Sequence, residues 1–173
     1  MAKVYLFDWG NTLMVDFPLP GKMCDWPKVE AVDGADQMLS ELSKTNQVFI
    51  ATSAVESSEQ DIQRAFERVG LSEYISGYFC KQNLGILKGS AEFYRAIVER
   101  LNVEANQVIM VGDTLEKDIT PAIEAGISAI WFNPSSSDSS LPHYAGTYNL
   151  ESKGAYQVHH LMELLPDLNE AKS

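Results

Sequence analysis

The chain has 173 residues, 45% of them hydrophobic, which is enough for one domain with a buried core. Its formal net charge of −11 argues against binding along duplex nucleic acid and against docking on an anionic membrane surface. No apolar run approaches the roughly 20 residues of a membrane span. Two cysteines, Cys24 and Cys80, are too few for a disulfide scaffold. We therefore expect a cytoplasmic protein with reduced thiols and with no nucleic-acid or membrane partner.

Short apolar runs alternate with amphipathic stretches along the chain. The expected elements, in order, are a strand at 3–8, a helix at 35–44, a strand at 47–52, a helix at 58–69, a strand at 77–80, a helix at 90–101, a strand at 107–112, a helix at 117–125, a strand at 128–132, a weak strand at 147–149 and a helix at 155–164. This alternation is typical of a three-layer α/β fold, in which helices cover both faces of a mostly parallel sheet.

One segment, residues 14–32, breaks this rhythm. It contains Pro18, Pro20, Gly21 and Pro27 and is too short to be a separate domain. We expect it to form a flap over the end of the first strand. Residues 1–173 are therefore interpreted as a single domain with 14–32 as an insertion. In such folds ligands bind at the carboxyl ends of the strands.

Polar residues stand at or near those predicted strand ends. In chain order they are Asp8 after the first strand, Thr52 and Ser53 after the second, Lys88 before a helix, and Asp113 with Asp118 after a later strand. Each has an ordinary explanation when taken alone, as a cap, a turn residue or a solvated side chain. Their arrival in order at successive strand ends instead indicates one site.

These residue types are the parts that phosphoryl transfer needs. Asp8 could attack an electrophilic phosphorus or carbon atom. Asp113 and Asp118 offer hard oxygen ligands, which suit Mg²⁺. The Thr52 hydroxyl and nearby backbone N–H groups could hold phosphate oxygens. Lys88 could neutralise the charge of both a phosphate and the Asp8 carboxylate.

At this point the chain resembles the haloacid dehalogenase-like (HAD) hydrolase superfamily, over residues 3–133. The first motif of that family is an apolar strand followed by Asp-x-Asp-Gly-Thr-Leu/Val, and this chain has Asp8-Trp9-Gly10-Asn11-Thr12-Leu13. The other motifs are a strand ending in Thr or Ser, a lysine, and Gly-Asp with a later Asp; they are matched by Thr52-Ser53, Lys88, and Gly112-Asp113 with Asp118. The resemblance implies a Rossmann-like core, and the short segment 14–32 resembles members without a cap domain.

The resemblance further implies a Mg²⁺-dependent phosphatase that forms an aspartyl-phosphate on Asp8 and acts on a small phosphorylated or acyl-phosphate substrate. Mg²⁺ would be held by Asp8, the backbone carbonyl of Gly10, and Asp113, with Asp118 in support. Lys88 would be catalytic, and the phosphoryl group would be bound by Thr52, Ser53, Lys88 and Asn11. Because the site would be open, a second subunit of a homo-oligomer could cover it.

Gly10 departs from the family pattern, because the family's phosphatases have there an Asp that protonates the leaving group and then activates water. Such acid–base help is worth about 10²–10⁴-fold in rate, so we expect weak activity or a restriction to good leaving groups. Two alternatives stay open. One is a catalytically impaired module that binds phosphate and metal or regulates. The other is a phosphonatase- or dehalogenase-type activity, of which the former needs a cap lysine and the flap offers Lys22 and Lys28.

Overall fold

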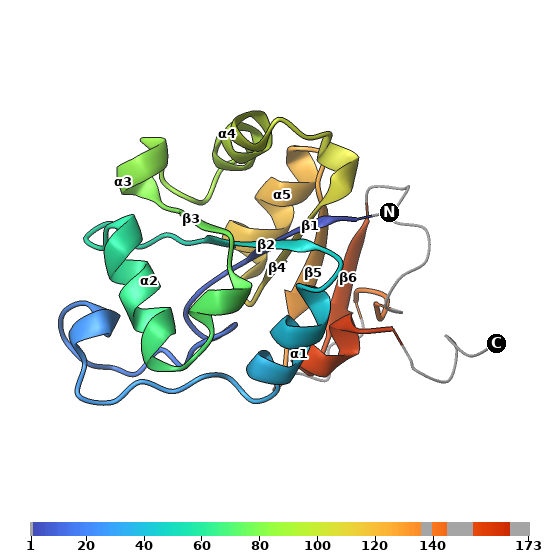
Figure 1. The fold of residues 1–173 in the computed structure, drawn as a ribbon. Coiled ribbons are helices and arrows are strands. Elements are labelled where there is room, and N and C mark those ends of the chain that lie inside the picture. The colour runs from blue at the N-terminus through green and yellow to red at the C-terminus, as the bar shows by residue number, and fades with distance from the viewer. Residues whose placement is uncertain (1, 136–139, 145–153, 167–173) are drawn as a thin grey trace.

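A single parallel sheet organises the computed structural model, which describes residues 2–135, 140–144 and 154–166 (Figure 1). Its order is β3-β2-β1-β4-β5-β6, and each neighbouring pair is parallel. The strands are β1 (Val4–Phe7), β2 (Gln47–Ala51), β3 (Gly77–Phe79), β4 (Val108–Gly112), β5 (Ser128–Phe132) and β6 (Ala155–Val158). The predicted α/β fold with a parallel sheet is confirmed, and strands predicted at five places are present.

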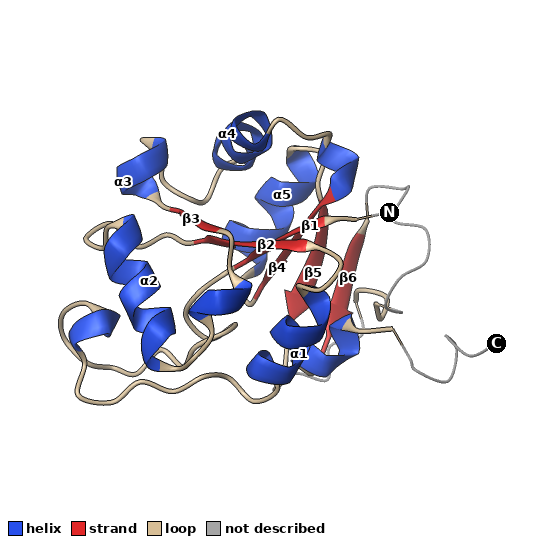
Figure 2. Ribbon diagram, in the orientation of Figure 1, coloured by secondary structure: helices blue, strands red, loops and turns tan. Residues whose placement is uncertain are grey.

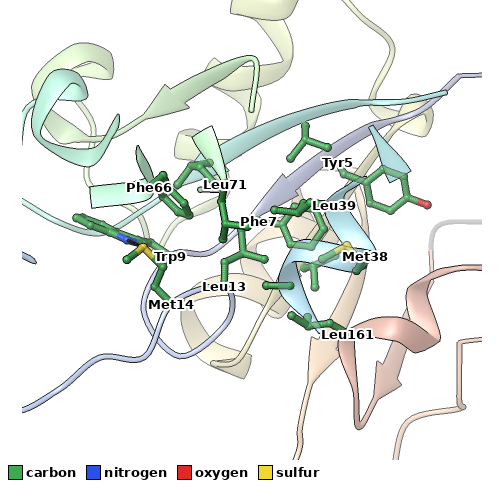
Figure 3. Packing of buried hydrophobic residues seen from close by; sticks show 14 of the residues in the cluster. Tyr5, Phe7, Trp9, Leu13, Met14, Met38, Leu39, Phe66, Leu71 and Leu161 are labelled. Atoms are coloured by element: carbon green, nitrogen blue, oxygen red, sulfur yellow. Dashed lines mark hydrogen bonds between the residues drawn. The ribbon is translucent and has the colours of Figure 1, made fainter. Parts of the chain in front are cut away.

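Helices cover both faces of this sheet (Figure 2). They are α1 (Ala35–Leu42), α2 (Glu59–Arg68), α3 (Lys81–Leu84), α4 (Ala91–Leu101) and α5 (Thr120–Glu124). Successive side chains of a strand point to opposite faces, so Phe7 joins the core beneath α1 and α2, whereas Leu6 joins the core beneath α4 and α5. Figure 3 shows the first of these cores, where Phe7 lies close to Met38 and Leu39 of α1.

The centre of the sheet is where the strand order changes direction. The chain runs outward from β1 to β2 and β3, and then returns to β4 on the other side of β1. Ligands of open α/β sheets bind at such a switch point, outside the carboxyl ends of the strands. The residues that follow β1 and β4 therefore lie side by side, and the Asp8 N–H donates to the Val111 carbonyl at 2.9 Å.

The helix predicted at 155–164 is wrong. Residues Ala155–Val158 form β6, which pairs with β5 in the register Ala129↔Ala155 to Phe132↔Val158. Only Leu161–Leu164 is helical, as a short 3₁₀ turn. The outer edge of β5 offers unpaired backbone groups, and pairing with them outweighs a local helical pattern. The weak strand predicted at 147–149 lies outside the described residues.

The segment 14–32 is packed onto α2. It contains a 3₁₀ turn, Met23–Asp25, and buries Trp26. The guanidinium of Arg68 donates to the Trp26 carbonyl at 2.6 Å and to the Cys24 carbonyl at 3.2 Å. Lys22 Nζ lies 2.8 Å from Asp61 Oδ2. These bonds fix one wall of the space beyond β1.

Cys24 and Cys80 are both free thiols, and both are buried. Of the helices in the described ranges, none combines the length and the apolar character needed to cross a bilayer.

Candidate active site

Asp8 stands at the carboxyl end of β1, at the centre of the sheet. Its side chain is nearly buried, with 8% of the residue exposed. One carboxylate oxygen, Oδ1, lies 2.7 Å from Lys88 Nζ, and the other accepts a hydrogen bond from the Thr12 hydroxyl at 3.2 Å. The position predicted for a nucleophile is thus held on a rigid strand end with both of its oxygens oriented.

Lys88 is the buried cation of the site. Its ammonium group lies 2.7 Å from Asp8 Oδ1 and 2.8 Å from Asp118 Oδ1, and it donates to the Ala51 carbonyl at 3.1 Å. Burial alone would lower the pKa of Lys88, but the charges of Asp8 and Asp118 outweigh it and raise that pKa. Lys88 is therefore a permanent positive charge beside Asp8, well suited to stabilise added negative charge.

Asp118 is positioned by the turn that follows β4. Its Oδ2 accepts a hydrogen bond from the Thr114 backbone N–H at 3.0 Å, and its Oδ1 faces Lys88. The predicted helix at 117–125 begins earlier than expected, as a wide π-type turn at Leu115–Ile119 that leads into α5. This turn brings Asp118 back toward the strand end. Because both of its oxygens face protein groups, the geometry favours a supporting role for Asp118.

Asp113 completes a cluster of carboxylates with Asp8 and Asp118. One oxygen from each of the three lies within 4.8 Å of the others. Burial, and then hydrogen bonding to Asp8 and the charge of Asp8, raise the pKa of Asp113 to about 7. Burial and the charge of Asp8 also raise the pKa of Asp118. The carboxylates thus crowd one another, with Lys88 as the one buried cation among them.

This donor set fits a divalent cation of the Mg²⁺ type. The ligand atoms are hard carboxylate oxygens, which Mg²⁺ prefers. Three carboxylates against one lysine leave two negative charges when all are ionised, which a divalent cation would balance. No hydrogen bond to Asp118 Oδ1 is found within the described residues, so this buried oxygen relies on charge alone. Three of the predicted metal residues, Asp8, Asp113 and Asp118, are therefore gathered in one place, and their role as Mg²⁺ ligands stays a prediction.

The remaining predicted residues line the same cavity. Thr52 follows β2, and its hydroxyl accepts a hydrogen bond from the Ala54 N–H at 3.1 Å. The cavity has a volume of about 490 Å³, and its walls include all the predicted site residues: Asp8, Gly10, Asn11, Thr52, Ser53, Lys88, Asp113 and Asp118. Residues distant in the sequence thus meet at the carboxyl ends of the strands.

Asn11 has a specific backbone role in addition to its place on the wall. Its φ of 61° lies in the left-handed region, which Asn tolerates better than most residues. Its side-chain oxygen accepts a hydrogen bond from the Asp16 N–H at 3.0 Å. In this structure the amide therefore braces a turn of the chain, while its assignment to phosphate binding stays a prediction.

Comparison with known proteins shows the family of this chain. A sequence model of the family described as haloacid dehalogenase-like hydrolase matches residues 21–126, more than half of the chain. The chain belongs to the haloacid dehalogenase-like hydrolases. The matched range contains the residues that close β2 and β4 as well as Lys88.

Individual HAD proteins are similar to this chain over part of their length. The HAD-hydrolase YfnB of Bacillus subtilis is 24% identical over 136 residues, which are 78% of this chain and 55% of YfnB. The pyrimidine 5′-nucleotidase YjjG of Escherichia coli is 29% identical over 101 residues, which are 58% of this chain and 44% of YjjG. The chain thus spans about half the length of these curated relatives.

Solved structures show the same fold. An uncharacterized protein from Listeria monocytogenes serotype 4b superposes with a TM-score of 0.75 at 22% identity, covering 98% of this chain and 96% of that one. A structure of YfnB described as bound to magnesium superposes with a TM-score of 0.70 at 17% identity, covering 94% of this chain and 96% of that one. At these identities the likeness establishes the HAD fold.

Three charged residues of the cavity wall were not predicted from the sequence: Asp16, Glu56 and Lys117. Lys22 was considered only as a flap lysine, and it is paired with Asp61. Lys117 is exposed at the turn after β4. The family motif places its second carboxylate two residues after the first, whereas Asp16 follows Asp8 by eight residues, so the motif does not point to Asp16. An acidic residue just past the first motif was the one available signal.

Proposed function

We propose that this protein is a Mg²⁺-dependent phosphatase that forms an aspartyl-phosphate on Asp8 and acts on a small phosphorylated or acyl-phosphate substrate. The observation that carries the proposal is the contact of Asp8 with Lys88 at 2.7 Å, at the edge of an open cavity and beside a carboxylate cluster. The names of similar HAD proteins, which include nucleotidases and phosphatases, support the same reaction class.

The chain's own residues supply most of the chemistry. The Asp8 carboxylate attacks the phosphorus atom, and the bond from phosphorus to the substrate oxygen breaks. Lys88 stabilises the charge on the phosphoryl oxygens as they pass from substrate to Asp8. Thr52 and Ser53, at the end of β2, orient those oxygens. Water then attacks the phosphorus atom, which releases inorganic phosphate and restores the Asp8 carboxylate.

Mg²⁺ would be held by Asp8, the Gly10 carbonyl and Asp113, with Asp118 in support. When bound, it supplies positive charge that offsets the phosphate charge and orients the phosphoryl group. Its binding can be measured without activity. MgCl₂ should raise the melting temperature of the wild type, because an ion that binds only the folded state stabilises it. The Asp113→Asn variant should show a smaller shift.

Purified protein with MgCl₂ and either p-nitrophenyl phosphate or acetyl phosphate tests the activity. We expect phosphate release from the wild type and background release from Asp8→Asn, a substitution that keeps the shape of the side chain but removes the nucleophile. Equal rates for the two proteins on both substrates would refute the proposed function.

Gly10 favours one second candidate, a module that binds phosphate and Mg²⁺ without turnover. This second candidate predicts that the protein binds inorganic phosphate but does not hydrolyse phosphate esters. A phosphonatase-type reaction is less well supported, because a Schiff-base lysine must lose its proton. Hydrogen bonding to Asp61, and then the charge of Asp61, raise the pKa of Lys22, which keeps this cavity lysine protonated. Lys28 is exposed and lies beside Glu30 at 3.6 Å.

A further inference from the structure

The space beside Gly10 is occupied by another carboxylic acid. A β-carbon built on Gly10 would lie 3.2 Å from Asp16 Cβ, 3.4 Å from Asp16 Cγ and 3.5 Å from Asp16 Oδ2. Gly10 is not among the residues with positive φ, so its backbone does not itself require glycine. What opposes a side chain at position 10 is the Asp16 side chain. The carboxylate that position 10 lacks is thus supplied to the same region from position 16.

A tight turn brings Asp16 back to Gly10. Asn11 reverses the chain with its left-handed backbone, and its N–H donates to the Met14 carbonyl at 2.6 Å. Gly10 and Met14 form an isolated β-bridge. The Asn11 side chain then accepts from the Asp16 N–H at 3.0 Å. These contacts place residues 14–16 alongside residues 10–11.

The turn is anchored in the core, so the position of Asp16 is not that of a loose loop. Leu13 and Met14 have no exposed surface. The indole N–H of Trp9 donates to the Met14 sulfur at 3.3 Å. Figure 3 shows Trp9, Leu13 and Met14 among the buried side chains of this core, and the Trp9 ring packs against Phe66 of α2. A group supported in this way can be held in a reactive geometry.

The Asp16 carboxylate is free to take part in chemistry. It lines the same cavity as Asp8 and Thr52, and the residue is exposed. In the part of the chain that the structure describes, its carboxylate oxygens make no hydrogen bond or ion pair; only its backbone N–H is engaged. A purely structural aspartate at a turn would use its side chain to bond the backbone. Access to water is what an acid and base must have in order to exchange protons.

We infer that Asp16 is the general acid and general base of this site, replacing the carboxylate that Gly10 does not provide; this inference rests on the proposed phosphatase function. In the first step protonated Asp16 gives its proton to the substrate oxygen while the phosphorus–oxygen bond breaks and the Asp8–phosphorus bond forms. The alcohol leaves and Asp16 is a carboxylate. In the second step Asp16 accepts a proton from the attacking water, phosphate leaves Asp8, and Asp16 is protonated again.

Leaving-group dependence tests this role. Phenyl phosphate has a poorer leaving group than p-nitrophenyl phosphate and needs the acid more. For Asp16→Asn we expect kcat/KM to fall about 10²–10⁴-fold on phenyl phosphate and less on p-nitrophenyl phosphate. Because the base of the second step is also lost, the variant should accumulate phosphoenzyme, detected by intact mass after acid quench. Asp25→Asn is the matched control, an exposed aspartate of the same segment that does not line the cavity.

Moving the carboxylate provides a second test. Removing the Asp16 side chain frees the space beside position 10. The double variant Gly10→Asp/Asp16→Gly should therefore recover turnover on phenyl phosphate relative to Asp16→Gly alone, whereas Gly10→Asp alone should be crowded by Asp16. Thermal melts of each variant separate lost chemistry from lost folding.

The outcomes distinguish the two proposals. An active wild type with an equally active Asp16→Asn on both substrates, or equal losses on both without phosphoenzyme, would overturn the role of Asp16 and leave the phosphatase function standing. A wild type no faster than Asp8→Asn would overturn both. An active wild type with a selective loss in Asp16→Asn and recovery in the double variant would establish the inference.

Discussion

The side chain of Asp118 fills the space in which Gly112 would carry a β-carbon. Such an atom would lie 2.2 Å from Asp118 Oδ2 and 2.5 Å from Asp118 Cβ, which is too close for any arrangement without movement. Asp118 cannot easily move, since Thr114 N–H and Lys88 hold its two oxygens. The glycine before Asp113 is therefore required by packing at the site itself.

Gly112→Ala should consequently push Asp118 away from Lys88. We expect a loss of stability of about 1–3 kcal/mol, the usual cost of overpacking, together with weaker Mg²⁺ binding. Denaturant unfolding and the melting-temperature shift with MgCl₂ measure the two effects. The double variant Gly112→Ala/Asp118→Gly also removes Asp118 Cβ, so the clash with that side chain is absent and the combined loss of stability should be smaller than the sum of the single losses. Additive losses would contradict this account.

Removal of Lys88 should be costly to folding as well as to activity. Lys88→Met leaves the Asp8 and Asp118 carboxylates buried without their cation, and breaking a buried pair in this way costs about 3–5 kcal/mol. Urea unfolding of the metal-free protein measures the loss. Lys44→Met removes a lysine whose ion pair with Glu41 is exposed, and it should change stability by less than about 0.5 kcal/mol. Similar losses of stability for both variants would argue that Lys88 does not stabilise the buried carboxylates of Asp8 and Asp118.

The positions of five strands, and the polar residues that follow them, could be predicted from the sequence. Continuous apolar runs such as 108–111 have few alternatives to a buried parallel strand, and Asp8, Thr52 and Asp113 follow such runs directly. β6 could not be predicted in this way. Ala155, Tyr156 and Val158 suit a helix face and a strand equally, and the decision comes from the open edge of β5, which lies more than twenty residues away in the sequence.

Asp16 could not be predicted from the family motif. The family pattern draws attention to position 10, where glycine indicates a missing group. The position of Asp16 beside Gly10 depends on the left-handed backbone of Asn11 and on the burial of Met14, which together return the chain to Gly10. Neither feature can be read from residue spacing alone, because it is the tertiary packing of Trp9 and Met14 that fixes the turn.

Acid should weaken the attachment of the 14–32 segment through Asp61. Hydrogen bonds from Lys22, the Ser58 N–H and Arg64 hold the pKa of Asp61 well below its usual range. A group with a depressed folded pKa adds stability above its unfolded pKa of about 3.9, and this stability is lost as pH falls through the folded value. The melting-temperature difference between the wild type and Asp61→Asn should therefore be full near neutral pH and shrink below about pH 4. In a Lys22→Gln background this melting-temperature difference should be smaller, because the hydrogen bond from Lys22 is the largest cause of the lowered Asp61 pKa. A difference that is constant with pH would contradict this origin.

Two substitutions of Asn11 should separate its backbone role from its side-chain role. Asn11→Gly keeps the left-handed backbone without strain but removes the acceptor of the Asp16 N–H, so stability should change little while turnover on phenyl phosphate falls as Asp16 loses its brace. Asn11→Ala loses the same acceptor and also places a β-carbon in the left-handed region, which costs about 1–2 kcal/mol. Thermal unfolding and steady-state kinetics measured on both variants test this separation. If Asn11→Gly retains the full rate on phenyl phosphate, the brace is not needed; if Asn11→Ala is as stable as Asn11→Gly, the turn does not depend on its left-handed backbone at this residue.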